Sequence, residues 1–147
     1  MSDASVSVEI FSDALCVWAY AAQIRIDELK RAFGTRVELH YRFTPVFSAC
    51  RERIKHGWED RGGFQGFNEN LMNTAVAWDH VHLHPDIWIG CVPESSTVAH
   101  LYLKAAQLLE QQGRMAGTNG QMSAGRTLFE EFYWQLRQAF FEQAENI

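Results

Sequence analysis

The sequence predicts an α/β fold in which a β-α-β unit is followed by a mostly helical region. Three stretches carry this prediction. Residues 5–11 alternate apolar and polar side chains, as a strand buried on one face does. Residues 17–33 change to helical spacing, and residues 36–43 alternate again. Two strands joined by a helix of this length are expected to be parallel.

The helix expected over residues 17–33 carries one apolar stripe and ends at Gly34, because glycine is common just past a helix end. The stripe consists of Trp18, Ala22, Ile26, Leu29 and Phe33. In the second strand, Val37, Leu39, Tyr41 and Phe43 share one face, opposite Glu38, His40 and Arg42.

Beyond residue 45 the pattern becomes mainly helical. Glycines at residues 57–66 indicate a loop before a helix, and residues 79–93 indicate an extended stretch bounded by prolines. The helix after the loop has Phe67, Leu71, Thr74 and Trp78 on one side. Ser95 or Ser96 is expected to cap the next helix. Its apolar residues are Val98, Leu101, Tyr102, Ala105, Leu108 and Leu109.

The C-terminal part of the chain predicts a loop and a final helix. The loop is marked by Gly113, Gly117, Gly120 and Gly125. The last helix is expected from Arg126 to about Ala144. Its inward side chains are expected to be Phe129, Phe132, Leu136 and Phe140.

Cys16 stands where the first strand meets the first helix. A cysteine at a helix N-terminus lies among unpaired backbone N–H groups, at the positive end of the helix dipole. This setting favours the thiolate, which is the reactive form. A helix start otherwise favours Ser, Thr, Asp or Asn. Cys16 is therefore interpreted as a reactive thiol, the alternative being a small buried apolar residue.

The run Phe11-Ser12-Asp13-Ala14-Leu15-Cys16-Val17-Trp18-Ala19-Tyr20 resembles the FSDxxCPWCY segment of the DsbA-like branch of the thioredoxin superfamily. Softer similarities lie at residues 41–43, 99–106 and 136–141. The resemblance implies that residues 1–45 form the N-terminal part of a thioredoxin-like domain. It also implies that residues 46–147 form a helical insertion domain.

The chain departs from this family in two ways. The family's second cysteine falls on Ala19, so an intramolecular CxxC disulfide cannot form. The final strands, last helix and cis-proline of the family have no counterpart before Ile147. We therefore expect a truncated domain, or one that another chain completes, because a two-stranded sheet is marginal alone. A free strand edge also favours a homo-oligomer.

The resemblance implies a thiol-disulfide oxidoreductase in which Cys16 is catalytic. Without a second cysteine we expect a monothiol route in which glutathione resolves the mixed disulfide of a small-molecule or protein substrate. Cys50 or Cys91 is the other candidate resolving thiol. The same branch resembles kappa-class glutathione transferases and 2-hydroxychromene-2-carboxylate isomerases, which commonly carry serine where this chain has Cys16. A glutathione-dependent isomerase or transferase is therefore one alternative, and a non-catalytic binding fragment is another.

Three further residues are candidates for the site. Asp13 is expected to relay a proton or bind the glutathione amine, the alternative being an Asx-turn at the strand end. Trp18 offers a flat apolar wall beside the thiol, or simply packs. Arg61 is a candidate carboxylate clamp for glutathione or an acidic substrate, because a guanidinium fork suits that geometry. Its alternative is an ion pair within a surface loop.

His80, His82 and His84 would point the same way in an extended segment and could then bind zinc. The family pattern does not require a metal, and only Asp86 lies close by downstream. We therefore expect no metal, with the three histidines forming an exposed edge.

Composition restricts the partners and the compartment. The 147-residue chain has a net charge of -5, which argues against nucleic acid as a partner. It has no long apolar run and no secretory leader pattern, so we expect no membrane partner. Three cysteines at irregular spacing do not suggest a disulfide framework. These features together predict a soluble protein of the reducing cytoplasm.

Overall fold

The fold begins with two parallel strands. The computed structural model describes residues 5–115 and 125–147, and the fold is mixed α/β. Strands β1 (Val6–Ser12) and β2 (Val37–Phe43) pair along their whole length, with Ile10 opposite Tyr41. This confirms the predicted β-α-β order and the parallel pairing. Within the described ranges, the sheet has these two strands only.

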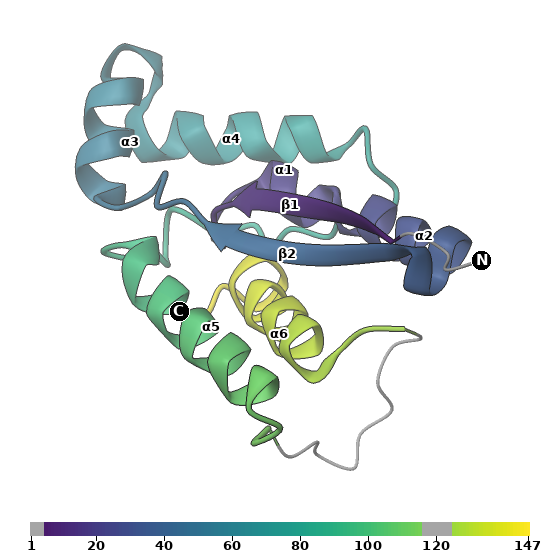
Figure 1. Cartoon of the computed structure of the whole chain (residues 1–147). Helices are drawn as coiled ribbons and strands as arrows, with labels where there is room; N and C mark the ends of the chain where they lie inside the picture. Colours follow the sequence, from purple (N-terminus) through teal and green to yellow (C-terminus); the bar gives the residue numbers. More distant parts are fainter. Residues whose placement is uncertain (1–4, 116–124) are drawn as a thin grey trace.

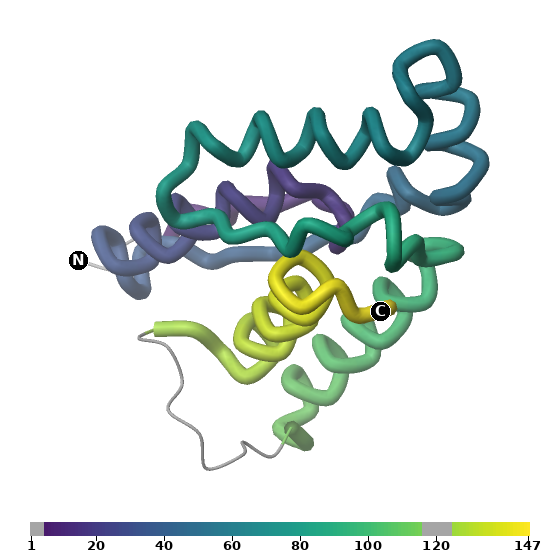
Figure 2. The backbone as a smooth tube through the Cα atoms, turned by 180° about the vertical axis from the view of Figure 1, so that it is seen from behind, coloured from purple at the N-terminus to yellow at the C-terminus, as the bar shows by residue number. Residues whose placement is uncertain are grey.

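Helices lie on both sides of the strand pair. Figure 1 shows α4 on one side and α5 with α6 on the other. Figure 2, seen from behind, shows the chain between α4 and α5 crossing in front of the strands. The connection between the strands consists of α1 (Val17–Ala21), α2 (Gln23–Phe33) and the 3-10 turn η1 (Gly34–Arg36). After β2 come α3 (Cys50–Trp58), the 3-10 turn η2 (Glu59–Arg61), α4 (Gly63–Ala75), α5 (Ser96–Gln111) and α6 (Leu128–Gln143).

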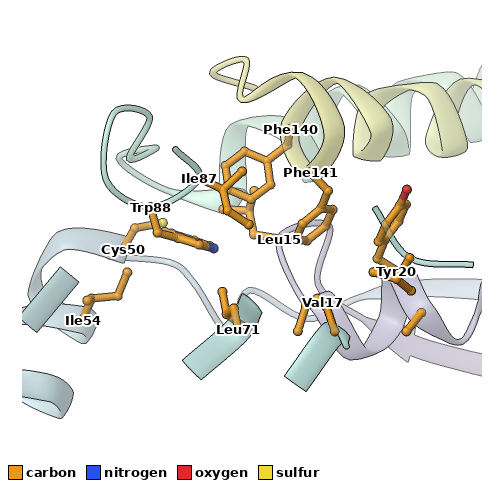
Figure 3. Packing of buried hydrophobic residues seen from close by; sticks show 13 residues of the cluster. Leu15, Val17, Tyr20, Cys50, Ile54, Leu71, Ile87, Trp88, Phe140 and Phe141 are labelled. Atoms are coloured by element: carbon orange, nitrogen blue, oxygen red, sulfur yellow. The ribbon is translucent and has the colours of Figure 1, made fainter. Parts of the chain in front are cut away.

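Two apolar clusters fill the interior. Figure 3 shows the first, in which Leu15 and Val17 at the start of α1 meet Phe140 and Phe141 at the end of α6, together with Trp88 from the chain before α5. The second cluster packs the sheet against α5 and α6. It contains Ala14, Tyr41, Ala99, Leu103, Ala106, Phe129 and Tyr133. Both clusters take residues from either side of residue 45, and the division into 1–45 and 46–147 stays a prediction.

The single helix expected over residues 17–33 is interrupted at Ala22, which ends α1 and begins α2. Its apolar stripe is only partly buried, with Ala22, Ile26 and Leu29 half-buried. Trp18 is 63% exposed, and Phe33 is exposed at the end of α2. The buried residues are Val17, Tyr20, Ala21 and Gln23. The helix turns this other face inward because α6 and the segment after α4 pack there.

Helices α5 and α6 also differ from the expected orientation. Ser95 caps α5, its Oγ accepting from Thr97 N–H at 3.0 Å. The apolar residues of α5 mainly face outward, and those exposed are Val98, Leu101, Tyr102, Leu108 and Leu109. In α6, Phe129 and Phe140 are buried as expected, whereas Phe132 is exposed and Leu136 is half-buried. Tyr133 and Arg137 occupy the buried face instead.

Two regions expected to be irregular or extended take another form. The loop expected around residues 57–66 is largely helical, since α3 runs through Trp58 and α4 begins at Gly63. Residues 79–93 form turns with one isolated bridge, between Ile87 and Cys91, rather than an extended segment. In the predicted C-terminal loop, Gly117 and Gly120 lie outside the described residues. Across the described ranges, no helix has both the length and the apolar character needed to cross a membrane.

Candidate functional site

Cys16 is the N-cap residue of α1, directly after the turn that ends β1. Its backbone is extended (φ −84°, ψ 114°), and its carbonyl accepts from Tyr20 N–H at 3.0 Å as the first bond of the helix. The thiol caps no backbone group, is half-buried and is not in a disulfide. Cys16 therefore lies at the start of a helix with a thiol that is not in a disulfide.

The turn before Cys16 is built on the side chain of Asp13. Asp13 Oδ1 accepts from Leu15 N–H at 2.8 Å, and the Asp13 carbonyl accepts from Cys16 N–H at 3.1 Å. This is the Asx-turn that was the alternative to a catalytic role. The catalytic role of Asp13 stays a prediction. The geometry shows that the Asp13 side chain holds the turn before Cys16 in place.

Asp13 also joins the turn to distant segments. Its Oδ2 accepts from Phe47 N–H at 2.9 Å and from Ser96 Oγ–H at 2.7 Å. The side chain is 1% exposed, so these donors replace water around the carboxylate. Asp13 therefore ties the end of β1 to the start of α3 and to the start of α5.

These contacts lower the pKa of Asp13 below its ordinary value. Burial opposes ionisation, but the nearby His100 ring and hydrogen bonds from the Phe47 and Leu15 amides and the Ser96 hydroxyl outweigh it. The His100 ring does not donate to Asp13 in this geometry. Its Nε2 lies 3.5 Å from Asp13 Oδ1, and it accepts from Ala14 N–H at 3.1 Å. We therefore assign the lower pKa mainly to the three shorter bonds, and Asp13 is an anion at neutral pH.

Trp18 and Arg61 lie apart in the structure. The Trp18 ring packs edge-to-face on Trp78, with centroids 4.8 Å apart, just past the C-terminal end of α4. Arg61 precedes the N-terminal end of α4. A helix of this length spans about 20 Å. Arg61 is therefore at the far end of α4 from Trp18, and the place of Trp18 beside the thiol stays a prediction.

Three residues of this region were missed by reasoning from sequence, namely Ser96, His100 and Arg137. Arg137 Nη1 donates to the Ala19 carbonyl at 3.1 Å, one turn after Cys16. The interruption at Ala22 leaves that carbonyl available to α6. A charged residue inside the apolar pattern of α6 was the only signal that could have pointed to Arg137.

The other two cysteines differ from Cys16 in their surroundings. Cys50 is fully buried, its Sγ donates to the Phe47 carbonyl, and burial raises the pKa of its thiol to about 11. Burial also raises the pKa of the Cys91 thiol above its ordinary value. Both effects keep these thiols protonated at neutral pH, so neither is well suited to attack a disulfide.

We expect iodoacetamide at neutral pH to modify Cys16 faster than Cys91, and Cys91 faster than Cys50. Cys16 is half-buried at a helix start, whereas burial raises the pKa of the Cys91 and Cys50 thiols and Cys50 is also fully buried. Peptide mass mapping after timed quenching measures the order. Denatured protein, in which the three cysteines should react at similar rates, is the control. Faster labelling of Cys91 or Cys50 in the folded protein would contradict the assignment.

The three histidines do not converge. His80 Nε2–H donates to the Ala21 carbonyl at 2.9 Å, His82 is exposed, and His84 Nδ1 accepts from Asp86 N–H at 3.1 Å. His80 and His84 thus bond to different backbone groups, and His82 faces solvent. In the parts of the chain described, no cluster of His, Cys, Asp and Glu could hold a metal ion.

Searches against protein-family models, curated proteins and solved structures found no match to this chain. The membership indicated by residues 11–20 therefore stays a prediction.

Proposed function

We propose that this protein is a thiol-disulfide oxidoreductase of the DsbA-like thioredoxin type that works through Cys16 alone. One observation carries the proposal: a half-buried, unpaired cysteine is the N-cap of α1, directly after a strand of a parallel β-α-β unit. The thioredoxin-like assignment of the fold belongs to the same proposal. It is supported by the strand-turn-helix geometry around Cys16 together with the motif of residues 11–20.

The proposed reaction has two stages. The Cys16 thiolate attacks one sulfur of a disulfide RS–SR′, forming Cys16–S–SR and releasing R′S⁻, which takes up a proton. One glutathione thiolate then displaces RS⁻ to leave Cys16–S–SG, and a second releases oxidised glutathione and regenerates Cys16. The net reaction reduces one disulfide to two thiols and oxidises two glutathione molecules to their disulfide. Ala19 supplies no internal thiol, so glutathione performs the resolving step.

The chain's own groups support the first stage. In this proposal, the positive end of α1 stabilises the negative charge that develops on the sulfur. The exposed Trp18 ring, braced on Trp78, gives an apolar surface on which a substrate next to the thiol can rest. Asp13 acts by positioning, since its carboxylate is occupied by backbone and hydroxyl donors.

The test is glutathione-dependent reduction of 2-hydroxyethyl disulfide, coupled to glutathione reductase and followed by NADPH consumption. We expect the wild-type protein to accelerate the reaction and Cys16→Ser to fall to the uncatalysed rate. Cys91→Ser is the matched control and should keep the wild-type rate, because Cys91 is also half-exposed but plays no part. Activity that survives in Cys16→Ser, or disappears in Cys91→Ser, would overturn the proposal.

Two other functions predict different results with the same variants. A glutathione transferase or isomerase is favoured by Ala19 at the second cysteine position. It would isomerise an aromatic substrate or conjugate glutathione to one, without reducing the disulfide. A binding module is favoured by the outward apolar face of α5, and it would show neither activity.

A further inference from the structure

A hollow between α3 and α4 lies away from Trp18 and plays no part in the proposed thiol chemistry. The cartoon and the tube view both show α3 against the first turns of α4 (Figures 1 and 2). The pocket has a volume of about 330 Å³, within the range of small-ligand sites, which is about 300–1,000 Å³. Its lining consists of Phe47, Arg53, Ile54, Gly57, Trp58, Arg61 and Phe67.

The apolar part of this pocket is a set of aromatic rings held by the core. The rings of Trp58 and Phe67 meet at 61° with centroids 5.3 Å apart. Phe67 and Phe47 both pack on the buried ring of Trp88, at 5.4 and 5.1 Å. The walls are therefore rigid, and they present flat apolar surface to a ligand.

Two arginines stand at the pocket without a carboxylate partner. The guanidinium of Arg61 lies 4.1 Å from the centre of the Trp58 ring, and that of Arg53 lies 5.4 Å from the centre of the Phe47 ring. Arg61 also donates to the Gly57 carbonyl. Over residues 5–115 and 125–147, neither arginine forms an ion pair, although Glu59 and Asp60 are close in sequence.

Two glycines lie at or beside this pocket, and one of them is required for the close packing of η2 on α4. A Cβ added to Gly66 would lie 1.8 Å from the Arg61 carbonyl oxygen, so only glycine lets the η2 turn sit against α4. That close approach brings Arg61 over Trp58. Gly57 places no side chain in the pocket wall, where an added Cβ would meet no atom within 4 Å.

From these features we propose that the pocket binds a small aromatic carboxylate, its ring against Trp58 and Phe67 and its carboxylate on Arg53 and Arg61. A stacked guanidinium is oriented by its ring and keeps N–H donors free for a carboxylate fork. The apolar walls favour an aromatic body over a bare anion. The site is separate from Cys16, and it does not depend on the proposed thiol chemistry.

The test is isothermal titration calorimetry with naphthalene-2-carboxylate as the probe. We expect a Kd at least about tenfold lower than for neutral naphthalene-2-methanol, since charge-assisted bonds are the stronger ones. Arg53→Gln and Arg61→Gln should each weaken carboxylate binding about tenfold. Arg51→Gln is the matched control, because Arg51 is on α3 but pairs with Glu94 at 3.1 Å and does not line the pocket.

Each arm of this experiment decides the proposal. Equal binding of acid and alcohol, no binding of either, or an equal loss in Arg51→Gln would overturn it. Inorganic phosphate binding as tightly as the probe would also overturn it, because that would indicate a simple anion site. Cys16→Ser should bind the probe like the wild type, so failure of the oxidoreductase proposal leaves this result unchanged.

Discussion

Replacing Asp13 by alanine is expected to lower the free energy of unfolding by about 3–5 kcal/mol. The substitution removes the acceptor of the Leu15 and Phe47 amides and of the Ser96 hydroxyl, all in a buried site. A buried donor left unpaired costs about 1–3 kcal/mol, and such losses within one network are not additive. Urea denaturation followed by circular dichroism measures the change. Asp86→Ala, at an exposed carboxylate, should leave the midpoint nearly unchanged.

The lowered pKa of Asp13 should also make the free energy of unfolding depend on pH. The folded-state pKa of Asp13 is lowered, so its ionisation stabilises the fold above the unfolded-state pKa of about 3.9. That contribution is lost as the pH falls through the lower folded-state pKa. The stability difference between the wild type and Asp13→Asn should therefore be largest near pH 7 and shrink toward about pH 3. A difference that stays constant over this range would contradict the role assigned to the charge.

Replacing Arg137 by alanine is expected to destabilise the fold by about 3–5 kcal/mol. Arg137 is 1% exposed, donates to the Ala19 carbonyl and to Gln23 Oε1, and lies 4.0 Å over the ring of Tyr133. Truncation leaves a cavity beside the aromatic rings and two acceptors without a donor. Burial lowers the pKa of this guanidinium, because removing its charge from water costs free energy. The hydrogen bonds and ring contact of Arg137 must offset that cost.

Arg137→Met separates packing from hydrogen bonding. Methionine refills most of the volume without a charge, so we expect a smaller loss of about 1–2 kcal/mol. Both variants should also change the alkylation rate of Cys16, since Ala19 is on the same short helix. Arg31→Ala, at an exposed arginine paired with Glu28, is the control and should leave the urea midpoint unchanged. A loss below about 1 kcal/mol in Arg137→Ala would refute the role.

The periodic patterns predicted which elements exist better than they predicted which sides are buried. The alternation in β1 and β2 predicted two parallel strands, and their register confirms it. The apolar stripe of α1 and α2 is buried only in part, since Trp18 and Phe33 are exposed. Periodicity shows where apolar residues recur along a helix. Which face is buried depends on which other segments pack against that helix. Helix α5 shows the same effect, since Leu101 and Tyr102 face solvent in this chain.

The candidate site also has features that the local sequence predicts and others that it does not. Local sequence was enough to place Cys16 at a helix start, because a strand, a short turn and a helix are contiguous there. The partners of Asp13 and Ala19 could not be read from sequence. Ser96 is 83 residues from Asp13, and Arg137 is 118 residues from Ala19. Nothing in local spacing links residues so far apart.

The sequence by itself determined the β-α-β order, the parallel strand pair, the cysteine before α1 and the absence of a second thiol at Ala19. The tertiary structure decided that Asp13 is a buried anchor, that Arg137 reaches the helix of Cys16, and that Arg61 is in a pocket with Arg53. The physical reason is the range of the interactions. Backbone hydrogen bonding and helix or strand spacing act between neighbours in the chain, whereas burial and side-chain pairing arise only when distant segments pack together.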